Sequence, residues 1–177
     1  MSKSKLASSV VFLSVCLIFP LIGWGAGSAG TTVTINATVD QFAEWGSAPY
    51  TIAAADWTGH ITATNQSRTL TLSKTLTLYA NANVTVTTTD GVNSGVLTNG
   101  TQTLTTEYKV TGGDLHVADV DADYISSAAF LAKSYHIDQV PGDGAYTMTL
   151  AVRMTSPNNR APDAGNYQCV LNMTATW

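Results

Sequence analysis

A two-residue alternation of threonine with apolar side chains dominates this chain and constrains its fold more than any other feature. Residues 32–39 read TVTINATV, and residues 69–79 read TLTLSKTLTLY. Threonine accounts for 27 of the 177 residues, and it favours half-buried strands while forming helices poorly. Because successive side chains of a strand point to opposite faces, the pattern predicts strands with one apolar face and one hydroxyl face.

More segments of this kind follow along the chain, separated by turn dipeptides such as Asp90-Gly91, Asn99-Gly100 and Gly112-Gly113. We expect strands at residues 50–54, 60–64, 69–72, 75–79, 84–88, 101–110, 145–154 and 167–177. Residues 124–134 are the one stretch that reads as a short helix. Many short strands joined by such turns predict an all-β fold, an immunoglobulin-like β-sandwich over residues 41–177.

The first 29 residues have the layout of a secretory signal peptide. Lys3 and Lys5 precede an apolar run at residues 10–22, and small residues follow at 26–29. The run is shorter than the roughly 20 residues that a membrane-spanning helix needs. We expect cleavage after Ser28 or Ala29, with an uncleaved anchor as the alternative. Cleavage would leave one cysteine, Cys169, in a compartment that allows disulfides.

Charge and residue spacing exclude several functions. Charged residues make up only 11% of the chain, its formal charge is −4 and its pI is about 5.1, so no basic surface for nucleic acid is expected. His60, His116 and His136 lack the spacing of zinc ligands. Glu44 and Glu107 are the only glutamates, and the aspartates crowd into turns. We therefore predict no catalytic residues, no cofactor and no enzymatic activity.

The two ends of the expected mature chain carry the clearest alternation. The last segment places one set of side chains on a single face: Tyr167, Cys169, Leu171, Met173, Ala175 and Trp177. The first segment, residues 30–40, does the same with Val33, Ile35, Ala37 and Val39. Edge strands are normally protected from further pairing by charged residues, and neither residues 32–39 nor residues 167–177 contain one. Both segments are therefore expected to pair with another chain.

The C-terminal region adds a family resemblance. Residues 164–167 read AGNY, an alternating strand follows, Trp177 closes it, and residues 144–152 before it read GAYTMTLAV. Together these features resemble the closing region of chaperone–usher pilins, nearest to the archaic branch related to spore coat U proteins.

The resemblance implies a structural pilus or coat subunit that polymerises by donor-strand complementation. In such subunits the sandwich lacks one strand and leaves a groove, which the next subunit's N-terminal segment fills. The donor would be residues 30–40, through Val33, Ile35, Ala37 and Val39. The acceptor would be formed by Tyr167, Cys169, Leu171, Met173 and Trp177. The implied partners are other copies in a filament, a periplasmic chaperone, an outer-membrane usher and a host or abiotic surface, with passage through the periplasm to the cell surface.

Two further patterns suggest ligands. Asp119, Asp121 and Asp123 have the spacing that begins a calcium loop, but Tyr124 occupies the glycine position of an EF-hand. We therefore predict no metal site and interpret the three aspartates as a solvated acidic face. They remain a weak calcium candidate. Trp45, Tyr50 and Trp57 are candidate ligand aromatics. A secreted carbohydrate-binding or adhesin sandwich is therefore one alternative function. The other is a small outer-membrane β-barrel, which would also end on an aromatic-closed strand.

Overall fold

The computed structural model describes residues 34–57, 68–113, 116–157 and 162–177. The chain divides into two units, Met1–Asp40 and Gln41–Trp177. In the first unit, residues 34–40 are exposed and have no secondary structure. The second unit contains every strand found among the described residues. The predicted signal peptide, Val33 and the strand expected at 60–64 lie outside the described residues.

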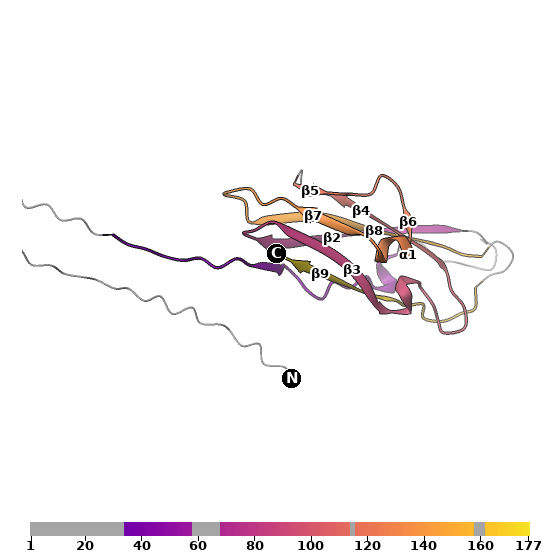
Figure 1. Ribbon diagram of the computed structural model, residues 1–177. Coiled ribbons are helices and arrows are strands. Elements are labelled where there is room, and N and C mark those ends of the chain that lie inside the picture. The colour runs from indigo at the N-terminus through magenta and orange to yellow at the C-terminus, as the bar shows by residue number, and fades with distance from the viewer. Residues whose placement is uncertain (1–33, 58–67, 114–115, 158–161) are drawn as a thin grey trace, which may run out of the picture. The chain divides into compact units, whose positions relative to one another are not determined.

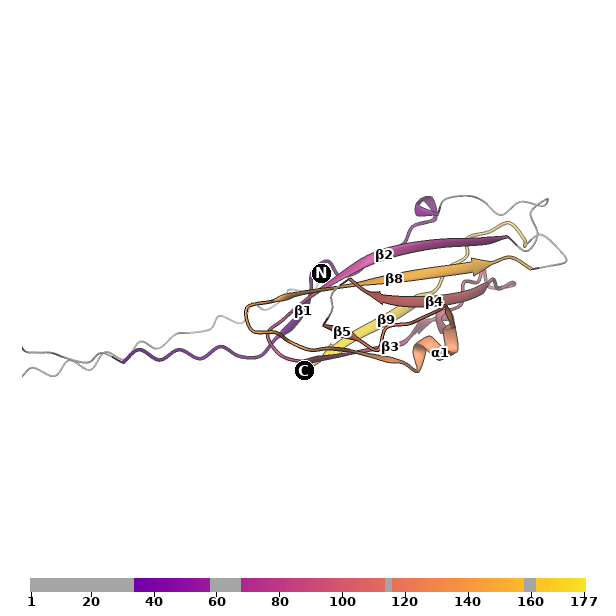
Figure 2. The same cartoon turned by 90° about the horizontal axis from the view of Figure 1, so that it is seen from above.

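The second unit is a sandwich of two antiparallel sheets, which confirms the predicted all-β class (Figure 1). One sheet has the order β1-β2-β8-β4-β6, with bounds Ala43–Trp45, Thr69–Ala80, Ala145–Thr155, Thr105–Gly112 and Ile125–Ser126. The other has the order β5-β7-β3-β9, with bounds Val117–Ala118, Ser134–Ile137, Val84–Val92 and Val170–Thr176. The strands are thus divided between two sheets rather than closing one sheet on itself (Figure 2).

The core lies between the sheets and is filled by every second residue of the long strands. The buried members on β2, β3, β4 and β8 are Leu70, Leu76, Leu78, Ala80, Val84, Val86, Tyr108, Val110, Tyr146, Met148, Leu150 and Val152. A short helix, α1 (Ser127–Leu131), confirms the helical turn expected at 124–134 and adds Phe130, whose ring stacks on Tyr108 at 4.6 Å. The Ser126 hydroxyl caps this helix by accepting from the Ala129 N–H.

Some strand boundaries differ from the expectation because local side-chain bonds compete with strand pairing. Residues 50–54 were expected to form a strand, but the Asp56 carboxylate accepts from the Ala53 N–H at 2.8 Å, and the 3-10 helix η1 (Ala54–Asp56) forms instead. The strand expected from residue 101 begins at Thr105, since the Asn99 side chain accepts from the Thr101 and Gln102 amides and holds a turn.

Other differences come from pairing across the sheet. The strands expected at 69–72 and 75–79 are one strand, β2, because Ser73 and Lys74 continue the pairing with β8 without a break. A second 3-10 turn, η2 (Asn93–Gly95), follows β3. The short strands β1, β5, β6 and β7 were not predicted, since two to four residues carry too little periodicity to be recognised. Among the described residues, no helix has the length and apolar character needed to cross a membrane.

Two buried tyrosines should make the fold sensitive to alkaline pH. Burial raises the pKa of Tyr108, and its hydrogen bond to Cys169 adds to the effect; burial and a hydrogen bond to Asp121 raise the pKa of Tyr135. Both phenols stay protonated in the folded chain while the unfolded chain ionises near pH 10. We therefore expect the free energy of unfolding to fall as the pH rises above about 10. Urea titrations at pH 8 and pH 11 measure the difference, and a Tyr108→Phe variant should show a smaller one.

Candidate functional site

The inner face of β9 is incompletely covered, unlike the inner face of the strand beside it. On β3, Val84 and Val86 are 3% and 0% exposed. On β9, the alternate residues Leu171, Met173 and Ala175 pack against the same core but remain half-buried. Side chains that face a core and still contact water are expected where a neighbouring strand is missing. The inner face of the last strand is therefore open to one side.

The backbone of β9 is open on the same side. β9 pairs with β3 from Thr85↔Thr176 to Val92↔Val170, with an irregularity between Asp90 and Val92. It is the last strand of its sheet, and no backbone hydrogen bond from the described residues reaches Val170–Thr176 from the other side. The strand contains no charged residue. An uncharged edge of this length is a template for another strand.

The β2 edge of the opposite sheet is protected by contrast. At its end, β1 pairs with Leu78, Tyr79 and Ala80. The backbone of Thr77 is then satisfied from outside the sheet, because its carbonyl accepts from the Gly46 N–H at 2.9 Å and its amide donates to the Tyr50 hydroxyl at 3.0 Å. Further along, Lys74 puts a charge at an inward-facing position, which discourages edge pairing.

The β4 edge is covered by a loop. Asp121 bonds twice to Val110 of β4: the Val110 N–H donates to the carboxylate at 2.7 Å, and the Asp121 N–H donates to the Val110 carbonyl at 2.8 Å. The same carboxylate accepts from Lys133 and from the Tyr135 hydroxyl. The fourth edge is β5, which is only two residues long. Among the described strands, β9 is thus the long edge that nothing covers.

The three candidate ligand aromatics lie along the margin of the core. Trp45, Tyr50 and Trp57 are half-buried and pack against the core cluster together with Ala43 and Ile52. Trp45 and Tyr50 meet edge to face at 6.3 Å. The Tyr50 hydroxyl is occupied by the Thr77 backbone. This contact set gives the rings a packing role on the side of the sandwich where β1 comes within 8 Å of β9.

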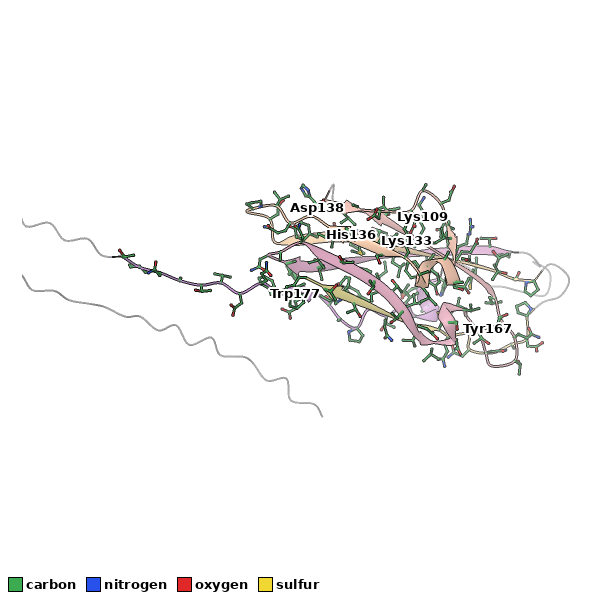
Figure 3. All side chains as sticks on the ribbon, viewed as in Figure 1. Lys109, Lys133, His136, Asp138, Tyr167 and Trp177 are labelled. Carbon is green, nitrogen blue, oxygen red and sulfur yellow. The ribbon has the colours of Figure 1, made fainter. Side chains whose placement is uncertain are left out.

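The other residues of the predicted acceptor lie at the two ends of β9. Tyr167 and Cys169 precede the strand and are half-buried, while Trp177 follows it and is 59% exposed (Figure 3). Trp177 borders a shallow hollow together with His136 and Asp138. Burial raises the pKa of the Cys169 thiol, a hydrogen bond with Tyr108 offsets part of this, and Asp90 raises the pKa further. Cys169 is therefore a weakly reactive thiol at the margin of the core.

The structure does not bring the three calcium-candidate aspartates together as ligands. Both carboxylate oxygens of Asp121 are engaged by protein donors, and Asp119 pairs with His136. Asp123 is exposed. Within the ranges that the structure describes, no three acidic, histidine or cysteine side chains are grouped as a metal site would require. Asp121 therefore has a structural role, because its carboxylate joins this loop to Val110 and Tyr135.

The described part of the predicted donor is exposed in its own unit. Ile35 and Val39 are 76% and 78% exposed, and Ala37 between them is also exposed. Because alternate side chains of an extended segment share a side, Ile35, Ala37 and Val39 give this segment one exposed apolar side. Covering Ile35 and Val39 would contribute roughly 3–6 kcal/mol in all.

Sequence reasoning overlooked one residue at each of these two edges, Ala175 on β9 and Lys74 on β2. Ala175 belongs to the inward face of β9 but was left out of the acceptor set, although the alternation alone could have identified it. Lys74 interrupts the apolar positions Leu70, Leu72, Leu76 and Leu78 of β2. The interruption is visible in the sequence, but only the strand pairing shows that Lys74 lies opposite Leu150, on the inward-facing side of β2.

No protein-family model and no curated protein matches this chain. The solved structures that are similar to it include two pilus proteins. One is a chaperone–usher pilus whose structure reveals the molecular basis of rod uncoiling. The alignment covers 89% of this chain and 99% of the pilus chain, with 18% sequence identity and a TM-score of 0.46. The other is the P pilus rod subunit PapA, over 82% of this chain and 99% of its own, at 17% identity and a TM-score of 0.39. The chain is thus structurally similar, at low sequence identity, to chaperone–usher pilus rod subunits. These similarities do not distinguish the branches of that group.

Proposed function

We propose that this chain is a structural subunit of a surface filament of the pilus type, in which residues 31–39 of one copy complete the sandwich of the next by lying beside β9. The observation that carries the proposal is the half-buried, uncharged and unpaired edge of β9. A strand added there would satisfy the free backbone groups and cover Leu171, Met173 and Ala175.

The second support is the match between that edge and the N-terminal segment. Residues 34–39 alternate polar and apolar side chains and contain no charge, as a strand between a core and solvent requires. A single copy then has one donor and one acceptor, so copies join head to tail and build an open filament rather than a closed dimer. The proposal includes export through the signal peptide, a periplasmic chaperone that covers the edge before assembly, and an outer-membrane usher.

Electron microscopy of the full chain beside a variant that lacks residues 31–39 tests this function. We expect thin filaments from the intact chain, and folded monomers or amorphous aggregates from the deletion variant because the edge stays open. Filaments from both proteins would show that another surface drives assembly. If both stay monomeric and well folded, the sandwich is already complete and the proposal fails.

A further inference from the structure

We propose that the shallow hollow beside Trp177 binds a neutral saccharide, with the indole packed on one sugar ring and the Asp138 carboxylate accepting from the sugar hydroxyls. The hollow has a volume of about 300 Å³, at the small end of the range for ligand sites in proteins. Its polar and aromatic lining comes from three neighbouring strands of one sheet and from residues directly beside them: Asn83, Thr85, His136, Asp138, Thr176 and Trp177.

The strand order β7-β3-β9 brings these residues together although they are far apart in the sequence. Thr85 of β3 pairs with His136 of β7 on one side and with Thr176 of β9 on the other. Asp138 follows β7 and Trp177 follows β9, and both lie toward the end of the sandwich opposite Tyr167 (Figure 3). The hollow therefore crosses the whole width of the β7-β3-β9 group at that end.

The polar groups of the hollow are held in place and still have bonding capacity. The Gln139 N–H donates to the Asn83 Oδ1 at 2.9 Å, which leaves the Asn83 NH₂ group as a donor. Asp119 bonds the Nδ1 atom of His136, and no bond to Nε2 is found within the described part of the chain. Asp138 is exposed, and among the described residues nothing bonds its carboxylate. One acceptor group and two nitrogen positions thus remain for a ligand.

This set of groups selects the class of ligand. A carboxylate only accepts hydrogen bonds and the Asn83 NH₂ group only donates them, whereas a hydroxyl group does both. A sugar ring offers several hydroxyls beside an apolar C–H face, which can pack on the indole of Trp177. An ammonium group could pair with Asp138 and pack on Trp177, but it has no acceptor for Asn83. An acidic sugar would be repelled by Asp138 and by the formal charge of −4.

The hollow is separate from the edge that the proposed function uses. A strand added beside β9 would lie on the side away from β3, whereas the hollow extends from β9 across β3 to β7. A shallow hollow should bind a single sugar ring with a dissociation constant on the order of 1 mM. If copies assemble as proposed, many such sites along one filament would hold a polysaccharide more tightly than one site does. Binding by a single copy does not depend on assembly.

Saturation-transfer NMR titrations of the full chain with the methyl α-glycosides of glucose, galactose and mannose test the site. We expect at least one of the three to bind. Asp138→Asn should weaken its binding about tenfold, because the charged acceptor is lost. Trp177→Ala should weaken binding at least as much, and Trp177→Phe less, because it keeps an aromatic face. Asp143→Asn is the matched control, since it removes an exposed carboxylate from the following turn and should leave the affinity unchanged.

The outcomes are distinguishable once circular dichroism has shown that the variants fold. Absence of binding by all three glycosides at about 20 mM overturns the inference. An affinity that Asp138→Asn leaves unchanged shows that the sugar binds elsewhere and also overturns it. Tighter binding of methylammonium or of methyl glucuronide overturns the ligand class. Failure of the chain to form filaments counts against the proposed function and leaves these titrations valid, because they need only the folded chain.

Discussion

Replacing Ile35 with aspartate is expected to abolish filament assembly while leaving the subunit folded. Ile35 is 76% exposed in its own unit, so the substitution removes no packing there. In the filament the same side chain would be buried beside β9, where an unpaired carboxylate costs several kcal/mol. A loss of about 4 kcal/mol weakens association roughly 1,000-fold. Sedimentation of filaments, followed by electron microscopy of the pellet, measures the effect, and Val39→Asp should act in the same way.

Asn36→Asp is the matched control for this prediction. It introduces the same charge one residue away, on the face of the segment that remains in solvent. We expect Asn36→Asp to assemble nearly normally. Normal filaments from Ile35→Asp would rule out this segment as the donor. Equal loss in both variants would point to a general effect of negative charge.

Replacing Asp121 with alanine is expected to lower the free energy of unfolding by about 3 kcal/mol, the largest stability effect that we predict. The Asp121 side chain is almost fully buried and accepts from Lys133, from the Tyr135 hydroxyl and from the Val110 amide. Its removal leaves a buried amide and a buried hydroxyl without their acceptor. Lys133 remains partly exposed, so water can solvate its ammonium and limits the loss.

Urea titration followed by circular dichroism measures this change, and Asp123→Ala supplies the control. Asp123 is two residues away on the same loop but is exposed, so its removal should change stability by less than about 0.5 kcal/mol. A similar small effect from Asp121→Ala would mean that the loop does not depend on this carboxylate. Calcium should change the stability of neither variant if Asp121 has the structural role described above.

The sequence predicted the parts of the fold that depend on local periodicity. The alternation in residues 145–154 corresponds to β8, and that in residues 84–88 to the first part of β3. It also identified which side chains of β9 face inward. Short strands such as β5 could not be predicted, because they exist only through pairing with β7. The burial of Asp121 could not be predicted for a related reason, since its donors come from two other segments of the chain, Val110 on β4 and the neighbouring Lys133 and Tyr135.

By itself, the sequence determined that this chain forms strands, which face of each long strand is apolar, and that its first and last segments lack protective charge. Those properties are local, because they follow from side-chain alternation along one strand. Only the tertiary structure decided that β9 is the uncovered edge and that Asp121 is buried. Strand order and depth depend on contacts between residues far apart in the chain, and no short stretch of sequence encodes them.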